Sequence, residues 1–191
     1  MNESLIIAAV KNEAEFQAAL ASDVKLIFHL VPNIMTLQDN IKQAHSSGKS
    51  FFIHLDLAEG IAKDKFGVKY VKTLGVDGII TTRANIVKFA KEEKLFTVQR
   101  FFILDSRSVE AIFETLKSSK PDMIEIMPGV VPKIISRLKE RLTIPIIAGG
   151  LIETKDEVQA IFNSGAKGVS TGKKTLWKKV KPVQRCTGFF A

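Results

Sequence analysis

The sequence predicts an α/β fold, a small single-domain (β/α)8 TIM barrel, from the order and spacing of its apolar runs. Eight runs of aliphatic, β-branched or aromatic residues begin at intervals of 18–27 residues, with amphipathic stretches between them. Alternating strands and helices with short connections form a parallel sheet. An open sheet usually has a glycine-rich turn after its first strand; here that strand ends Ala8-Ala-Val-Lys-Asn12, so a closed barrel is favoured. The runs begin near Leu5, Leu26, Phe51, Gly78, Phe96, Met123, Ile144 and Gly168.

Capping residues predict where the helices between these runs begin and end. Thr36-x-x-Asp39 and Thr154-x-x-Glu157 match the capping box, and Asp105 can cap the helix that follows the fifth run. The third unit is the least regular, because residues 56–63 form a loop before a helix that ends near Leu74. Gly48, Gly75 and Gly165 each close a helical stretch.

The composition is that of one globular domain. The chain has 191 residues, of which 46% are hydrophobic and 25% charged, enough to bury a core without disulfides. Its single cysteine, Cys186, excludes a disulfide framework, and its three histidines show no metal-ligand spacing. No apolar run approaches the ~20 residues of a membrane span, and no signal peptide is visible. We therefore expect a cytoplasmic protein without membrane association, metal or cofactor. The barrel is expected over residues 1–181, followed by a tail, 182–191, that is either disordered or folded back.

The net charge of +8 is concentrated near the C-terminus. Residues 1–166 hold 21 Lys and Arg and all 20 Asp and Glu, whereas residues 167–191 hold seven Lys and Arg and no acid. This asymmetry indicates a polyanionic partner, and a solubilising tail explains it equally well. A helix expected after the eighth strand would bury Leu176 and Val180, with Trp177 at the edge of that face. Its lysines, spaced 4 and 3 apart on one face, are candidates for RNA binding: Lys174, Lys178 and Lys181.

A candidate phosphate site follows the last two strands. The run Ile144–Gly150 ends in a glycine pair, and the run Gly168–Gly172 leads into Lys173. The loops after strands 7 and 8 frequently bind phosphate in this fold, because glycine lets the backbone approach and N–H groups at a helix start face the anion. Either turn alone reads as an ordinary strand-to-helix connection, but the pair in this order favours phosphate. The candidate phosphate-binding residues are Gly149, Gly150, Thr171, Gly172 and Lys173.

The alternation of side chains along each strand predicts which polar groups enter the barrel. In residues 51–57 the odd positions are apolar, which directs His54 and Asp56 inward; the same argument places Glu125 inside. Arg100 interrupts an apolar strand, and because a buried unpaired charge is costly, it must meet an acid or a bound anion. Arg100 bridges Asp56 and Glu125 in an ion-pair network, or the three contact a ligand directly, or both hold. His54 reads more simply as a hydrogen-bonded interior histidine, and Lys11 lies within reach of the same anion.

Several motifs in this order resemble those of one known family. They are His54-Leu-Asp-Leu57 with Gly60, Gly78-Ile-Ile-Thr-Thr82, Gln99-Arg100 running to Leu104-Asp105, Pro121-Asp122 with Ile124-Glu-Ile-Met-Pro-Gly-Val130, Ile144–Gly150 and Leu176-Trp-Lys178. Over nearly its full length the chain resembles the glycerol-3-phosphate-responsive antiterminators.

This resemblance implies a cytoplasmic regulator that senses glycerol 3-phosphate and acts on leader mRNA, so that transcription of glycerol-utilisation genes continues past a terminator. A ligand role is carried over to Gly149, Gly150, Gly172 and Lys173. Asp56, Arg100 and Glu125, with His54 in the same pocket, are the candidates for the glycerol end.

Other classes of function remain open from the sequence. A barrel enzyme that acts on a small phosphorylated substrate could use inward acids and a lysine as acid and base, although no lysine lies inside a strand to form a Schiff base. A glycerophosphodiester phosphodiesterase needs a carboxylate-rich metal site, which is not evident. A bare interaction scaffold leaves the paired glycine turns unexplained. Homo-oligomerisation is left open.

Overall fold

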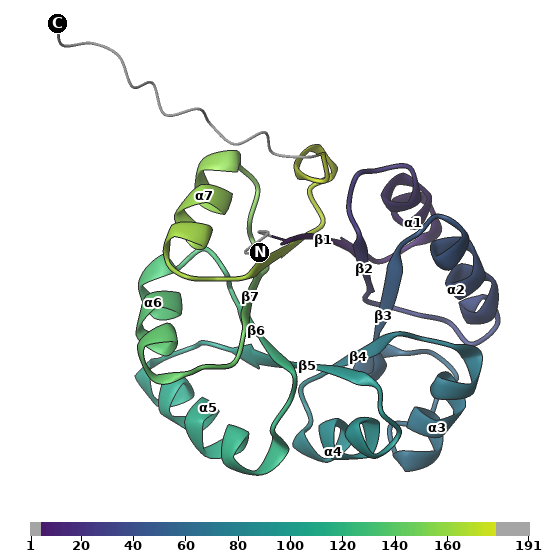
Figure 1. Cartoon of the computed structure of the whole chain (residues 1–191), viewed down its shortest axis with the longest axis horizontal. Coiled ribbons are helices and arrows are strands. Elements are labelled where there is room, and N and C mark those ends of the chain that lie inside the picture. The colour runs from purple at the N-terminus through teal and green to yellow at the C-terminus, as the bar shows by residue number, and fades with distance from the viewer. Residues whose placement is uncertain (1–4, 179–191) are drawn as a thin grey trace, which may run out of the picture.

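The computed structural model describes residues 5–178, which form a closed barrel of parallel strands enclosed by helices (Figure 1). The strands are β1 (Leu5–Val10), β2 (Leu26–His29), β3 (Ser50–His54), β4 (Gly78–Thr81), β5 (Phe96–Phe102), β6 (Met123–Met127), β7 (Ile146–Gly149) and β8 (Gly168–Thr171). The α-helices are α1 (Glu13–Leu20), α2 (Leu37–Ser46), α3 (Lys65–Leu74), α4 (Ala84–Glu92), α5 (Ser106–Ser119), α6 (Pro132–Arg141) and α7 (Lys155–Asn163). Strands pair in chain order and β8 pairs with β1, which confirms the predicted (β/α)8 barrel.

Two strands begin slightly away from the predicted positions. β3 starts one residue early, at Ser50, and β7 starts at Ile146 rather than Ile144. Pro145 has no N–H to donate to a neighbouring strand, so regular pairing begins after it. The other six strands begin where the apolar runs do.

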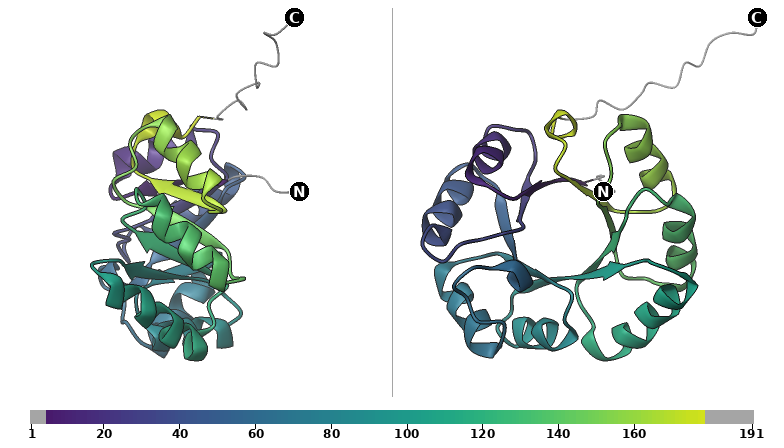
Figure 2. Two further views of the ribbon diagram at one scale, coloured as in Figure 1. Left: turned by 90° about the vertical axis from the view of Figure 1, so that its left-hand side faces the viewer. Right: turned by 180° about the vertical axis from the view of Figure 1, so that it is seen from behind.

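The strands separate one inner layer of side chains from two outer clusters. The inner layer is formed by Ile7, Leu26, Phe28, Phe52, Ile80, Val98 and Ile147. One outer cluster lies under α1–α4 and the other under α5–α7, and Figure 2 shows this ring of helices edge-on and from behind. Phe51 and Ile53 belong to an outer cluster and Phe52 to the inner layer, which confirms the alternation predicted for β3.

The predicted helix caps are confirmed at two of three positions. Asp105 and Thr154 each accept a backbone N–H three residues ahead and complete capping boxes. The box predicted at Thr36 is wrong, because Thr36 has helical backbone angles and its side chain makes no capping hydrogen bond. An N-cap side chain reaches its partner from an extended backbone. The irregular third unit is confirmed: a 3-10 turn, η1 (Leu55–Leu57), and a loop precede α3.

The prediction of a helix after β8 is wrong for the residues that the structure describes. A 3-10 turn, η2 (Lys174–Leu176), follows β8 instead and lies between α7 and α1 (Figure 1). Leu176 joins one outer cluster and Trp177 is buried in the other, where its Nε1 donates to Thr171 O at 2.8 Å. These contacts close the seam of the barrel without an α-helix, so Lys174 and Lys178 share no helix face. Val180, Lys181, Cys186 and the tail 182–191 lie outside the described residues.

None of the helices within residues 5–178 has the length and apolar character needed to cross a membrane.

Candidate functional site

A cavity of about 380 Å3 opens at the C-terminal ends of the strands, beside the seam between β8 and β1. This end of a (β/α)8 barrel is where active sites lie. Three cationic side chains line it, Lys11, Arg100 and Lys173, together with the carboxylate of Glu153. Lys11 and Lys173 form no ion pair within residues 5–178. The cavity therefore presents an excess of positive charge.

Four of the five predicted phosphate-binding residues line this cavity, namely Gly150, Thr171, Gly172 and Lys173. The fifth, Gly149, does not line it. A Cβ atom at Gly149 would overlap Glu125 Oε1 and lie 2.8 Å from Ser170 Oγ, so a side chain there would displace both groups. Close packing under the cavity therefore explains why a glycine occupies position 149.

Hydrogen bonds of Thr171 join the two loops that form the cavity wall. Its Oγ1 donates to Ile152 O at 2.8 Å and accepts from Lys173 N at 3.0 Å. The Lys173 N–H is therefore already engaged, and the turn η2 offers no α-helix N-terminus to an anion. The side chains of Lys11, Arg100 and Lys173 add positive charge to the cavity. At Gly172 the backbone is open, since a Cβ atom would meet only Ala9 O at 3.5 Å.

Arg100 and Glu125 form a buried ion pair under the cavity. Arg100 Nε lies 2.6 Å from Glu125 Oε2, and the side chains are 6% and 0% exposed. The other carboxylate oxygen, Oε1, accepts from Ser170 Oγ. Glu125 therefore holds Arg100 in place and does not itself line the cavity. A guanidinium has five N–H donors, and those of Arg100 other than Nε have no partner within the described residues.

Asp56 is not brought to this pair. It accepts hydrogen bonds from Thr81 Oγ1 at 2.6 Å, at the end of β4, and from Thr82 N and Oγ1 at 2.7 Å in the turn that follows. Burial raises the pKa of Asp56, but the contact with His54 and these hydrogen bonds outweigh it and hold the pKa well below its usual range. Within the described chain no ion pair joins Asp56 to Arg100, so the arginine does not bridge two acids. Asp56 orders the β4–α4 turn.

His54 is buried beside Asp56, and neither of them lines the cavity. Its Nε2 lies 3.6 Å from Asp56 Oδ2, too far for a regular hydrogen bond. Both ring nitrogens are buried without a hydrogen-bond partner. The inward orientation predicted for His54 agrees with the inner position of Phe52 on the same strand, but the expected hydrogen bonds are not formed.

Ser170 and Glu153 line this cavity and were not predicted from the sequence. The hydroxyl of Ser170 donates to Glu125. Ser170 lies on β8 two positions after Gly168, so the alternation used for β3 and β6 would have placed it inside as well. Among residues 5–178, no group of three His, Cys, Asp or Glu is arranged to hold a metal ion.

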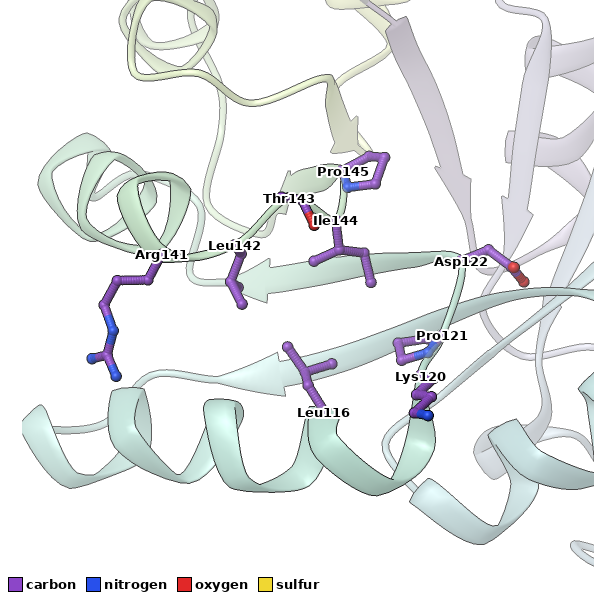
Figure 3. A pocket seen from close by; sticks show the side chains of 9 residues that line it. All are labelled: Leu116, Lys120, Pro121, Asp122, Arg141, Leu142, Thr143, Ile144 and Pro145. Atoms are coloured by element: carbon purple, nitrogen blue, oxygen red, sulfur yellow. The ribbon is translucent and has the colours of Figure 1, made fainter.

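A second hollow, of about 420 Å3, lies at the opposite end of the strands between α5 and the segment after α6. Leu116, Leu142 and Ile144 project into it (Figure 3). Its two oppositely charged side chains Arg141 and Asp122 have structural partners: Arg141 contacts Glu110 and the Phe113 ring, and Asp122 accepts from Thr97 and Lys91. The cavity beside β8 is therefore the better candidate for ligand binding.

Comparison with known proteins places this barrel in a family. The family model described as glycerol-3-phosphate responsive antiterminator matches residues 6–177. A solved glycerol uptake operon antiterminator regulatory protein from Listeria monocytogenes is 34% identical, with a TM-score of 0.87, over 92% of this chain and 95% of that one. A solved glycerol uptake operon antiterminator-related protein from Thermotoga maritima is 30% identical, with a TM-score of 0.83, over 92% and 99% of the two chains. The uncharacterized protein YgcP of Escherichia coli is 36% identical over 182 residues, 95% of each chain.

More distant solved structures, at 9–16% identity, include decarboxylase, epimerase and aldolase barrels and show the fold alone. The family model, which matches nearly the whole chain, and the two solved relatives indicate the same family. This chain belongs to the glycerol-3-phosphate-responsive antiterminator family.

Proposed function

We propose that this chain is a cytoplasmic sensor of glycerol 3-phosphate that binds leader mRNA and lets transcription of glycerol-utilisation genes pass a terminator. The observation that supports the sensing half is the cavity lined by Lys11, Arg100 and Lys173. A phosphomonoester has a charge of roughly −1.5 to −2 at neutral pH, and three cations complement it. The volume of about 380 Å3 lies in the range of small-molecule sites.

The cationic groups have different roles in this proposal. Arg100, oriented by Glu125, presents a planar fork that suits two phosphate oxygens, and Lys173 adds a point charge from the other side of the cavity. The open backbone at Gly172 lets the anion approach. Glu153, an acceptor on the cavity wall, receives the hydroxyl groups of the glycerol end. Glu125 acts through Arg100 and makes no contact with the metabolite.

Thermal unfolding tests the sensing half. A ligand at 100 times its Kd stabilises the folded state by about 2.7 kcal/mol, which raises Tm by roughly 5–10 °C for a chain of this size. We expect such a rise with millimolar glycerol 3-phosphate, a smaller one with inorganic phosphate and none with glycerol. K173Q should lose most of it, whereas K155Q, at an exposed position on α7, should keep it. Unchanged melting of the wild-type chain at millimolar metabolite would refute the sensing half.

A gel shift with leader RNA tests the regulatory half. Glycerol 3-phosphate can change RNA affinity only through different binding to two states of the protein, and the coupling is reciprocal. We expect the metabolite to tighten RNA binding and RNA to tighten metabolite binding by the same factor. The enzyme alternative makes a different prediction, because NMR would then show turnover of glycerol 3-phosphate by the chain alone.

A further inference from the structure

Helix α3 presents aromatic side chains to solvent on the side away from the barrel. Phe66 is 67% exposed and Tyr70 39% exposed, while Val68 and Val71 of the same helix fill the core. Among the α-helices of residues 5–178, these two are the large hydrophobic side chains that are exposed to solvent. Packing within the barrel therefore does not explain them. Figure 1 places α3 on the outer ring, far from η2.

A row of lysines lies beside these aromatic side chains. Lys65, Lys69 and Lys72 are spaced 4 and 3 apart and share one face of α3, which contains no acid. Lys65 Nζ lies 5.0 Å from the centre of the Phe66 ring. Two acids lie close by: Asp64 caps the helix, and Glu93 Oε1 is 3.9 Å from Lys69 Nζ. A single carboxylate at that distance leaves the row with a positive excess.

We propose that the α3 face, defined as Lys65, Phe66, Lys69, Tyr70 and Lys72, binds a single-stranded segment of RNA. The proposal rests on the proposed function, since it assigns a surface to the RNA partner. Proteins bind single-stranded nucleic acid by stacking bases on exposed aromatic rings while basic side chains contact the phosphates. Phe66 and Tyr70 lie one helical turn apart, so each ring can receive one base.

Charge argues for RNA rather than a second copy of this chain on the α3 face. Two copies meeting through this face would bring their lysine rows together, and like charges repel, whereas a phosphate backbone neutralises them. The lysines near the C-terminus lack this combination within the described residues. Trp177, the aromatic residue between Lys174 and Lys178, is only 2% exposed and unavailable for stacking.

Fluorescence anisotropy tests the α3 face with labelled RNA transcribed from the leader upstream of the glycerol-uptake genes, at saturating glycerol 3-phosphate. F66A/Y70A should weaken binding at least tenfold, because stacking on one aromatic residue is worth about 1–3 kcal/mol per base and 1.4 kcal/mol is tenfold. K65Q/K69Q should lower the slope of log K against log salt by about 1.4, from roughly 0.7 per phosphate contact. L104A, which truncates a side chain that is 88% exposed elsewhere, and K155Q are the matched controls and should bind within twofold of wild type.

Each outcome separates this surface from the proposed function. The rise in Tm with glycerol 3-phosphate should be unchanged in every variant, which shows that the barrel and its cavity are intact. If F66A/Y70A bound leader RNA as tightly as the wild-type chain, the assignment of RNA binding to the α3 face would be overturned, and the proposed function would stand. If K174A/K178A lost RNA binding while the α3 variants kept it, the α3 face would likewise be overturned and the proposed function would stand. A change in oligomeric mass of F66A/Y70A on size exclusion, with RNA binding unchanged, would identify a protein interface. Failure of the wild-type chain to bind leader RNA at any metabolite concentration would remove the proposed RNA function itself.

Discussion

Replacing Glu125 with Gln tests the buried ion pair that holds Arg100 under the cavity. The change preserves shape and leaves no void, so its effect is electrostatic. Arg100 Nε and Glu125 Oε2 are 2.6 Å apart and both side chains are buried. Removing one partner of such a pair costs about 3–5 kcal/mol, because the other charge stays buried without compensation. Arg100 also lines the open cavity, so we take the lower end, about 3 kcal/mol.

For a chain of this size a loss of about 3 kcal/mol lowers Tm by roughly 6–12 °C, which circular dichroism melting measures directly. The matched control is E153Q, the same change at an exposed glutamate on the cavity rim, where surface substitutions stay within about 0.5 kcal/mol. The rise in Tm with glycerol 3-phosphate should also shrink in E125Q, because Arg100 is no longer oriented. A Tm within 2 °C of wild type, with an unchanged far-UV spectrum, would refute this reasoning.

A double variant separates stability from ligand binding at the same place. Replacing a buried ion pair with apolar residues of similar volume is often neutral or stabilising. R100M/E125L should therefore recover most of the Tm lost in E125Q while showing no response to glycerol 3-phosphate. If R100M/E125L recovered both the Tm and the response to glycerol 3-phosphate, Arg100 would not contact the phosphate.

Three further substitutions test the packing and the backbone around the site. Burial lowers the pKa of His29 to about 4, against a smaller opposing effect of Glu13, so the unfolded chain takes up the proton first and stability falls as pH drops from 6.5 to 4. Urea unfolding should show a loss of about 3 kcal/mol across this window, which H29L should remove. G149A should lower Tm by several degrees, since its Cβ would overlap Glu125 Oε1. G172A should melt like wild type, because the site is open, but bind glycerol 3-phosphate more weakly; equal affinity would exclude close approach of the anion to this backbone.

The sequence predicted the barrel and the inward residues because both follow from local, periodic patterns. Side chains alternate along a strand whatever the rest of the chain does. The inner position of Phe52 and the requirement that Arg100 meet an acid or a bound anion therefore both follow from the amino-acid sequence alone. The acid that Arg100 meets, Glu125, was among the predicted residues, because the same alternation directs it into the barrel. Its second partner, Ser170, is 45 residues away and carries no charge. Alternation along β8 would place this hydroxyl inside the barrel, but no local pattern marks it as a partner of Glu125.

The same limit explains the residues that were placed wrongly. One of the two alternatives for Asp56 paired it with Arg100 on charge. Its hydrogen bonds instead come from two threonines, 25 and 26 residues away, at the end of β4 and in the turn that follows, and its charged neighbours are His54 and Arg83. The spacing of Lys174 and Lys178 fits a helix, yet the structure forms a 3-10 turn there. Leu176 and Trp177 are adjacent in sequence and enter different core clusters on either side of the seam. Adjacent residues do not share a helix face, so two consecutive large apolar residues after β8 were better evidence for a turn that closes the barrel than the lysine spacing was for a helix.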